Sequence, residues 1–419
     1  MDASGHDKPL PSGTRRSGWR SLLQAAGCRL RGGQLELYLG ADPQPLVLGR
    51  DGPRAALQLR DERTLLRILS YPALRFGEAY MDGAWQPRGG SLLQVLEAAL
   101  GIEAALESHP LIRRAKRLRS RFVERNTPRR SRRNASHHYD LDFELYRRFL
   151  DQDLHYSCAY FREETMTLEQ AQQAKCAHIA AKLDLKPGAR VLDIGCGWGS
   201  LAMHLAEKHG AHVTGITLSE EQCKVARERA KARGLADRVE FRLEDYRATR
   251  GPFDAIVSVG MFEHVGRPQY PVFFERAREL LDDRGTMLLH SIGRSTPPGG
   301  SNPWINKYIF PGGYIPAASE VLPWIEKSGL ILADLEVWRL HYARTLAAWH
   351  ERFQNARAEI AAKLGERFCR MWEFYLQASE ASFRWGGLVV FHFQLIKRLQ
   401  RLPLTRNYLY APPAPHPGA

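Results

Sequence analysis

The sequence predicts an α/β protein whose main domain is a doubly wound, mostly parallel sheet, preceded by a smaller N-terminal domain. Three observations support this prediction. Short apolar runs alternate with amphipathic segments from Arg190 onward, a glycine-rich loop follows the first of these runs, and turn signals divide the N-terminal quarter of the chain. Strands that alternate with helices form parallel sheets covered by helices on both faces. A chain of 419 residues is long enough for two domains.

Each expected element of the main domain follows from its local pattern. Short apolar runs are typical of strands buried in such a sheet, and we expect strands at 190–194, 212–216, 239–242, 253–259 and 286–290. Apolar residues at helical spacing between these runs predict helices at 200–208, 220–233 and 271–281.

The smaller N-terminal domain is expected to occupy residues 19–110, where glycine and proline turn signals separate its elements. Apolar residues at helical spacing predict helices in 63–80 and 92–106. The two ends of the chain, 1–18 and 411–419, lack apolar periodicity, and we expect them to be flexible.

The net charge of +14 indicates an anionic partner or surface. Eleven basic residues lie between Arg113 and Arg133, where Glu124 is the only acid. Apolar residues recur there at helical spacing, which predicts a basic linker helix in 111–136, ahead of the main domain at 137–410. Such a helix suits an anionic membrane surface or a nucleic acid. A solvated linker helix accounts for the same pattern equally well.

The six cysteines are scattered and include no CxxC pair. This spacing gives no sign of a zinc site or a disulfide framework, so we expect no metal and a reducing compartment. The sequence has no signal peptide pattern and no apolar run of about 18 residues that spans a bilayer. We therefore expect a soluble, cytoplasmic protein.

The glycine loop 193–199, with the sequence DIGCGWG, follows the first expected strand, where ligands bind in such sheets. Its GxGxG pattern with an acid two residues ahead differs from the GxGxxG fingerprint of dinucleotide sites. A pyrophosphate needs the positive helix N-terminus free of competing charge, whereas a sulfonium amino-acid cofactor tolerates a carboxylate such as Asp193. The loop therefore predicts an S-adenosylmethionine site that includes Asp193, Gly195 and Gly197.

The second expected strand lacks the terminal acid that binds ribose hydroxyls in many related folds. Ribose recognition is left to Thr217, Glu220, Gln222 or main-chain groups. Asp245 and Tyr246, after the third strand, suit an adenine, with a carboxylate for its amine and a ring for stacking. The structural alternative is a helix cap at Asp245 and core packing for Tyr246.

A series of longer motifs makes the comparison with known families specific. They are HYD at 138–140, YSCAY at 156–160, LDIGCGWG at 192–199, GITLS at 215–219, VSVGMFEHVG at 257–266, HSIG at 290–293, WINKYIFPGG at 304–313 and RF at 352–353. Together they resemble the cyclopropane fatty acid synthase family of class I S-adenosylmethionine-dependent methyltransferases. FGEAYMDG at 76–83 resembles the smaller domain of full-length bacterial members.

The resemblance implies a Rossmann-like fold with a helical lid insertion, and transfer of a methylene from S-adenosylmethionine to the cis double bond of an unsaturated phospholipid acyl chain. It implies cofactor contacts at Tyr156, Ser157, Gly195, Gly197, Thr217, Leu218, Gln222, Asp245 and Tyr246. It also implies a bicarbonate ion as catalytic base, held at Cys158, Glu263, His290, Ile292 and Tyr342.

The chemistry of alkene methylation requires orientation, a dry pocket, cation stabilisation and a base. In this interpretation Glu263 accepts a hydrogen bond from the hydroxyl of bicarbonate, while His290 and Tyr342 donate hydrogen bonds to the same ion. Aromatic faces stabilise cations. We expect most of a set of aromatics to line the acyl pocket and one or two to be core: Phe262, Trp304, Tyr308, Phe310 and Tyr314. The structural alternatives are a core histidine at His290, a Glu263–His264 pair and a small apolar residue at Cys158.

A cysteine in the C-terminal helix of some family members is replaced here by Ser379, which disfavours covalent thiol catalysis. The expected partners are an unsaturated phospholipid and an anionic membrane surface, at the inner face of which the protein binds peripherally, with no nucleic acid. The resemblance also implies a homodimer. Three alternatives stay open: a related enzyme that leaves a methyl or methylene branch, a nucleic-acid methyltransferase suggested only by basicity, and a non-catalytic lipid-binding protein.

Overall fold

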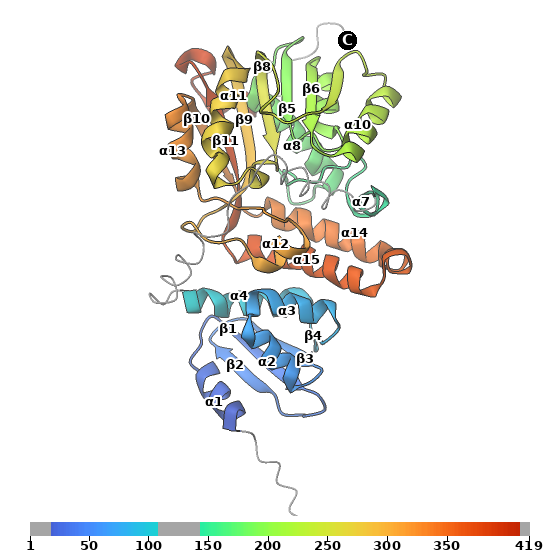
Figure 1. Cartoon of the computed structure of the whole chain (residues 1–419), viewed down its shortest axis with the longest axis vertical. Helices are drawn as coiled ribbons and strands as arrows, with labels where there is room; N and C mark the ends of the chain where they lie inside the picture. Colours follow the sequence, from blue (N-terminus) through green and yellow to red (C-terminus); the bar gives the residue numbers. More distant parts are fainter. Residues whose placement is uncertain (1–17, 108–142, 411–419) are drawn as a thin grey trace, which may run out of the picture.

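The computed structural model describes residues 18–107 and 143–410. The basic helix expected in 111–136 lies outside the described residues, as do almost all of the two ends expected to be flexible. The described chain contains two sheets, one in each of the regions expected to be a domain (Figure 1).

The N-terminal sheet has four strands in the order β2-β1-β3-β4. They are β1 Gly33–Leu39, β2 Leu46–Arg50, β3 Arg54–Leu59 and β4 Trp85–Pro87. The accompanying helices are α1 Gly18–Gly27, α2 Glu62–Ser70, α3 Pro72–Met81 and α4 Leu92–Glu107. Strand β1 alternates buried and partly buried residues, so one face of this sheet packs into an apolar core that also contains residues from the C-terminal half of the chain.

The helical pattern expected over 63–80 divides into two helices at Tyr71. Proline lacks an amide hydrogen and its ring disfavours the α conformation in the preceding residue, so Pro72 ends one helix and begins the next. Asp61 caps the first helix, because its carboxylate accepts the amide of Thr64 at 2.7 Å.

The main sheet has seven strands in the order β10-β11-β9-β8-β5-β6-β7. They are β5 Arg190–Ile194, β6 His212–Thr217, β7 Val239–Leu243, β8 Phe253–Val259, β9 Leu281–Arg294, β10 Ile331–Trp338 and β11 Leu388–Ile396. Strands β5 to β9 pair in parallel, and β11 is antiparallel to both neighbours. The prediction of a mostly parallel sheet is confirmed, although β9 is longer than expected and β10 and β11 were not expected.

Helices cover both faces of this sheet, as a doubly wound fold requires (Figure 1). One apolar core lies under α8 Leu168–Leu183, α9 Ser200–His209 and α10 Glu220–Ala232. The core on the opposite face lies under α11 Tyr270–Leu280 and α13 Ala318–Ser328. Neighbouring residues on β5, such as Val191 and Leu192, contribute to opposite cores, which explains why apolar residues follow one another here instead of alternating with polar ones.

A helical layer lies between the main sheet and the N-terminal sheet (Figure 1). It contains α14 His341–Leu364 and α15 Glu366–Arg384, which pack against each other, with α12 Pro303–Tyr308 beside them. Helices α3 and α4 of the small domain pack against α15, and α3 also packs against α12. The short helix α7 Phe143–Phe149 packs on α14.

Two of the recognised motifs meet in this layer. Glu78 of FGEAYMDG is buried, and its Oε1 accepts hydrogen bonds from Lys307 Nζ at 2.7 Å and Tyr308 Oη at 2.9 Å, both within WINKYIFPGG. A side chain at Gly77 would place its Cβ 2.6 Å from the indole of Trp304. Residues 18–107 are therefore joined to the rest of the described chain through a close and specific contact.

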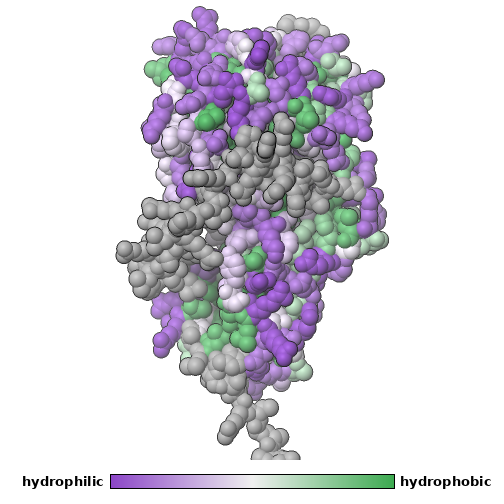
Figure 2. All heavy atoms as spheres, viewed as in Figure 1, coloured by the Kyte–Doolittle hydropathy of each residue, from purple (hydrophilic) through white to green (hydrophobic). Residues whose placement is uncertain are grey.

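The face of the molecule in Figure 2 is mostly hydrophilic where its residues are described, with hydrophobic residues at scattered positions. Within residues 18–107 and 143–410, none of the helices combines the length and the apolar character needed to cross a bilayer.

Candidate active site

The glycine loop lies at the carboxyl end of β5 and leads into α9. Gly195 and Gly197 have φ values of 87° and 54°, a backbone region that side chains rarely adopt. A Cβ on Gly195 would lie 2.8 Å from Cβ of Met261. The two glycines therefore allow the loop to turn tightly beside a cavity that the loop helps to line.

The cavity brings together the whole set of residues predicted to contact the cofactor. These residues are Tyr156, Ser157, Asp193, Gly195, Gly197, Thr217, Leu218, Gln222, Asp245 and Tyr246. They come from four separate segments of the chain, and the ends of β5, β6 and β7 supply most of them. Glu220, one of the candidates for ribose, is exposed and lies outside this lining.

Asp193 places a carboxylate in the wall of the cavity without exposing it to solvent. Burial raises the pKa of Asp193 to about 7, although the nearby Lys175 ammonium opposes that rise. A buried carboxylate gains from a cationic neighbour, so this wall favours a positively charged ligand.

Side chains at the ends of β6 and β7 are already ordered by hydrogen bonds. Thr217 Oγ1 donates to Gln222 Oε1 at 2.8 Å, and the main-chain amide of Gln222 donates to Ser219 Oγ. Both oxygens of Asp245 accept hydrogen bonds from the guanidinium of Arg247, at 2.8 and 2.6 Å. The Asp245 carboxylate is therefore held in place by Arg247, whose main-chain amide also donates to it.

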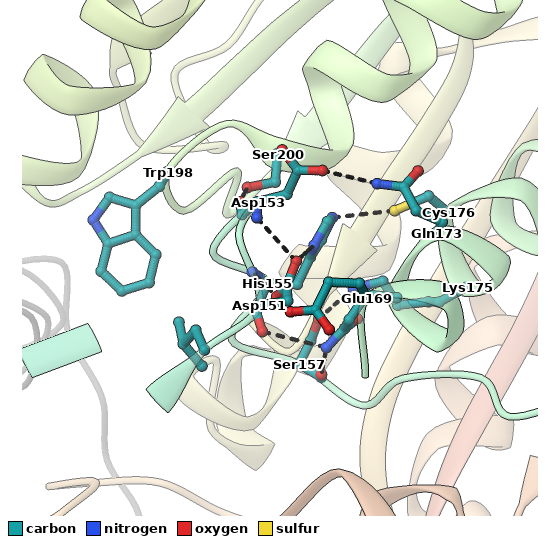
Figure 3. Close-up of polar contacts among 12 residues, drawn as sticks. Asp151, Asp153, His155, Ser157, Glu169, Gln173, Lys175, Cys176, Trp198 and Ser200 are labelled. Atoms are coloured by element: carbon teal, nitrogen blue, oxygen red, sulfur yellow. Dashed lines mark hydrogen bonds and ion pairs between the residues drawn. The ribbon is translucent and has the colours of Figure 1, made fainter. Parts of the chain in front are cut away.

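A buried polar network, which the sequence prediction did not include, lies beside the same cavity (Figure 3). His155 Nδ1 lies 2.8 Å from Asp151 Oδ2, and its Nε2 lies 3.2 Å from Cys176 Sγ. Lys175 Nζ donates to Ser157 Oγ at 3.0 Å. His155 and Lys175 both line the cavity, so the network fixes the segment that carries Tyr156 and Ser157.

The sequence contained one signal for this network. Gln172, Lys175, His178 and Lys182 recur at helical spacing along α8, and all four are buried. A polar stripe on the face of a helix that packs against a sheet indicates a buried polar network, because unpaired polar groups are costly there.

Glu263 follows β8 in a short 3-10 turn and is buried. Its Oε1 accepts the main-chain amide of Ile292 at 2.6 Å, while its buried Oε2 has no hydrogen-bond partner in the described chain. Burial raises the pKa of Glu263 to about 7, although the Ile292 amide and the nearby Ser291 hydroxyl, which itself donates to the Ile292 carbonyl, oppose that rise. The site therefore contains an acceptor oxygen that is ready for a donor.

Three other residues of the predicted anion site, Cys158, Tyr342 and Ile292, contribute to a single apolar cluster. Burial raises the pKa of the Cys158 thiol, so this residue is a neutral thiol and not a nucleophile. Ile292 and His290 are two residues apart on β9 and share one face of that strand.

His290 is buried, and its Nδ1 lies 2.7 Å from His392 Nε2 on the neighbouring strand β11. Burial lowers the pKa of His290 to about 3, so its imidazole is neutral. None of the five predicted anion-site residues is among those that line the glycine-loop cavity. Glu263 therefore contacts Ile292 directly. Cys158 and Tyr342 belong to the same apolar cluster as Ile292, and His290 shares a strand face with it.

The aromatic residues expected around an acyl chain have different surroundings. Phe262 packs on Tyr270 and Phe273 in the core beneath α11, and is thus one of the expected core residues. Trp304 packs on Phe374 in the layer between the sheets, and Tyr314 Oη donates to Glu320.

A second aromatic cluster, which the sequence did not indicate, surrounds Tyr156. It contains Tyr146, Phe149, Tyr156, Trp198, Trp349, Trp372 and Tyr375. Tyr156 and Trp198 also line the cavity, so this cluster places aromatic faces beside the cofactor site.

Comparisons with known proteins agree with this geometry. The family model described as mycolic acid cyclopropane synthetase matches residues 126–393. The chain is 40% identical to the cyclopropane-fatty-acyl-phospholipid synthase of Escherichia coli (strain K12), over 79% of this chain and 85% of that protein. It is 35% identical to a probable fatty acid methyltransferase of Pseudomonas putida, over 89% of this chain and 93% of that protein. Mycolic acid cyclopropane synthase CmaA1, solved with SAH and CTAB, matches with a TM-score of 0.60 at 34% identity, over 63% of this chain and 97% of that one.

Proposed function

This chain belongs to the cyclopropane synthase family of S-adenosylmethionine-dependent methyltransferases, and from that membership we propose its substrate and mechanism. The enzyme transfers a methylene group from S-adenosylmethionine to the cis double bond of an unsaturated acyl chain in a membrane phospholipid. The alkene attacks the sulfonium methyl, the bond between that methyl and sulfur breaks to release S-adenosylhomocysteine, and the acyl chain becomes a carbocation. Loss of a proton from the new methyl group then closes the ring.

The structural observation that carries this proposal is Glu263, a buried carboxylate with one engaged oxygen and one free acceptor oxygen. Ring closure needs a base in a dry site, and a buried acceptor is suited to orient one. The glycine-loop cavity, lined by the ten predicted contacts, supports binding of the cosubstrate beside it.

Bicarbonate fits this arrangement as the base. Its hydroxyl would donate to Oε2 of Glu263, the buried oxygen that lacks a partner. Cys158, His290, Ile292 and Tyr342 are the further residues we assign to the same ion. When bound, the ion supplies the oxygen that accepts the proton. Glu263 and His290 orient it, and apolar neighbours of Cys158 and Tyr342 exclude water.

Access to the lipid requires that the enzyme dock on a bilayer. The net charge of +14 and the basic segment between Arg113 and Arg133 support binding to an anionic membrane surface. We propose peripheral association with the cytoplasmic face of the membrane, with no nucleic acid as partner. We also propose a homodimer.

The central test is incubation of the full-length protein with methyl-labelled S-adenosylmethionine and vesicles of unsaturated phospholipid. We expect label in the fatty acyl fraction after extraction. Label confined to the head groups, or absent from the lipid, would disprove the proposal.

The second candidate is a related C-methylation that leaves a methyl or methylene branch, because the same cation loses a different proton. Similarity to the probable fatty acid methyltransferase of Pseudomonas putida favours this candidate. A methylene branch and a ring have the same mass, so ozonolysis or hydrogenation of the product distinguishes them.

A further inference from the structure

A row of polar side chains crosses three strands on one face of the main sheet. The strand register pairs Glu336 of β10 with His392 of β11, and His392 with His290 of β9. Side chains of directly opposed residues in antiparallel strands lie on the same face, roughly 5 Å apart. The row therefore runs from the edge strand β10 to His290 in the interior of the sheet.

Only one hydrogen lies between the facing ring nitrogens of the two histidines. His290 and His392 are both buried and their facing nitrogens are 2.7 Å apart. Burial lowers the pKa of both imidazoles, so both are neutral near pH 7. A neutral imidazole has one N–H and one acceptor nitrogen, so one histidine donates and the other accepts.

Two arrangements satisfy this contact. If His392 Nε2 donates, His392 Nδ1 is a bare acceptor and the hydrogen of His290 lies on Nε2. If His290 Nδ1 donates, the hydrogen of His392 lies on Nδ1 and Nε2 of His290 is bare. The two arrangements therefore give His290 opposite hydrogen-bonding properties at Nε2.

The far nitrogen of His392 decides between them. His392 Nδ1 is buried and has no hydrogen-bond partner within the described chain. A buried nitrogen without a partner is unfavourable in either arrangement, but an unpaired buried N–H is the rarer and more costly case, so the second arrangement is disfavoured. The Lys182 ammonium on α8 lies close enough to disfavour added positive charge on His392, and it likewise favours a lone pair over an N–H.

The other charged groups around His392 form contacts with one another, and their opposite charges are paired. Glu336 Oε2 lies 2.6 Å from Lys182 Nζ and 2.8 Å from His178 Nε2, and His341 of α14 is also close. His178, Glu336 and His392 offer three potential metal ligands within 4.8 Å of one another. The Lys182 ammonium already pairs with the Glu336 oxygen, and its charge opposes a metal ion there. The group is therefore better described as a partly buried ion pair between Lys182 and Glu336, to which His178 is hydrogen-bonded.

We propose that His392 is a positioning residue that holds His290 in the tautomer with its hydrogen on Nε2. This inference rests on the proposed function, in which His290 donates a hydrogen bond to the anionic base. With the hydrogen on Nε2 the imidazole offers a donor on the side opposite His392. The other tautomer would present a lone pair there and would repel an anion.

The first test is the tautomer of His290 in the full-length wild-type protein. Two-bond ¹H–¹⁵N correlation spectra of ¹⁵N-histidine-labelled protein distinguish protonated from bare ring nitrogens, and signals missing from His290→Asn identify this residue. We expect a protonated Nε2 and a bare Nδ1. A protonated Nδ1 overturns the proposal, whatever the enzymatic activity is.

The second test uses two substitutions at the same position. His392→Gln retains a side-chain N–H that donates to His290 Nδ1, whereas His392→Leu has no donor. We expect His392→Leu to lose the tautomer preference and to lower kcat by about 10- to 100-fold, the scale for removing a partner that orients a functional histidine. The KM for S-adenosylmethionine should not change, and His392→Gln should retain the tautomer and most of kcat.

Equal losses of kcat in both variants, with the tautomer of His290 unchanged, would show a merely structural role and overturn the proposal. If His392→Leu does not fold, the wild-type spectrum and His392→Gln still decide. Failure of the proposed function appears instead as a lack of label in the acyl chains, and it leaves the tautomer measurement intact.

Discussion

Oε1 of Glu263 accepts the main-chain amide of Ile292 at 2.6 Å, and this contact leaves Oε2 as a buried acceptor without a partner in the described chain. The hydrogen bond joins the end of β8 to β9, so the orientation of the carboxylate depends on the pairing of two strands of the main sheet. An acceptor held in this way can position a second group without rearranging.

Glu263→Gln should lower kcat by about 10²- to 10⁴-fold, the usual contribution of a positioned acid–base group. The amide keeps the size of the side chain but replaces an acceptor oxygen with a donor. Affinity for S-adenosylmethionine, measured by calorimetry, should be unchanged. Glu275→Gln, on the exposed side of α11, is the matched control. Undiminished turnover in Glu263→Gln would remove this residue from the mechanism.

The pH dependence of the reaction should reflect the same carboxyl. The pKa of Glu263 is about 7, and only the ionised form offers an unprotonated Oε2. We therefore expect kcat/KM to rise with pH through about 7 and then to level off. The measurement requires a constant concentration of bicarbonate itself, not of total carbonate. A flat profile between pH 6 and 8 would contradict the assignment, since roughly a tenfold change in ionised fraction is expected there.

Cosubstrate binding should depend on the ionisation of Asp193. Its pKa is about 7, and a cationic ligand binds more tightly to the carboxylate than to the neutral acid. The affinity for S-adenosylmethionine should therefore increase as pH rises through about 7, and Asp193→Asn should bind more weakly with no such increase. Lys175→Met removes a cation that lowers this pKa, so its midpoint should shift to higher pH. Calorimetric titrations across this range measure all three behaviours.

Glu78→Gln should weaken the contact between the small and main domains by roughly 2 kcal/mol, the scale of hydrogen bonds to a charged group. Hydrogen bonds from Lys307, Tyr308 and Arg75 outweigh the effect of burial and lower the pKa of Glu78 from 4.5 to about 2. The stabilisation is therefore complete above pH 4.5 and is lost as pH falls through about 2.

Denaturant unfolding of wild type and Glu78→Gln at a series of pH values tests this expectation. The difference in unfolding free energy should shrink between pH 4.5 and 2. Glu62→Gln is the control, because the partner of Glu62, Arg20, lies within the small domain. An equal effect of both substitutions would argue against a specific contact between the domains.

Binding to vesicles of anionic phospholipid should weaken as salt is added, because exposed charges are screened. Reversing the charges of Arg113, Arg114, Arg117 and Arg121 should abolish most of this binding, at about 1 kcal/mol for each basic residue near the surface. Sedimentation with anionic and neutral vesicles provides the comparison. Binding that is insensitive to salt, or that survives the charge reversal, would refute a role for this segment.

The sequence predicted the parallel part of the main sheet well, because short, largely apolar segments alternate there with amphipathic helices. It did not indicate β10 and β11, which lie beyond the regular alternation of strands and helices. It treated residues 63–80 as continuous, although Pro72 divides them. The sequence does not choose among the ribose candidates at the end of β6, whereas the structure places Thr217 and Gln222, but not Glu220, in the cavity wall.

The sequence by itself determined the fold class and the family, because the glycine loop and the longer motifs are runs of consecutive residues that can be identified without a structure. Only the tertiary structure decided which polar groups share a buried environment. Ile292 reaches Glu263 through strand pairing, and His392 reaches His290 across 102 residues of chain. Pairing of this kind depends on register and burial, which place distant residues on one face of a sheet and remove the water that would otherwise satisfy them.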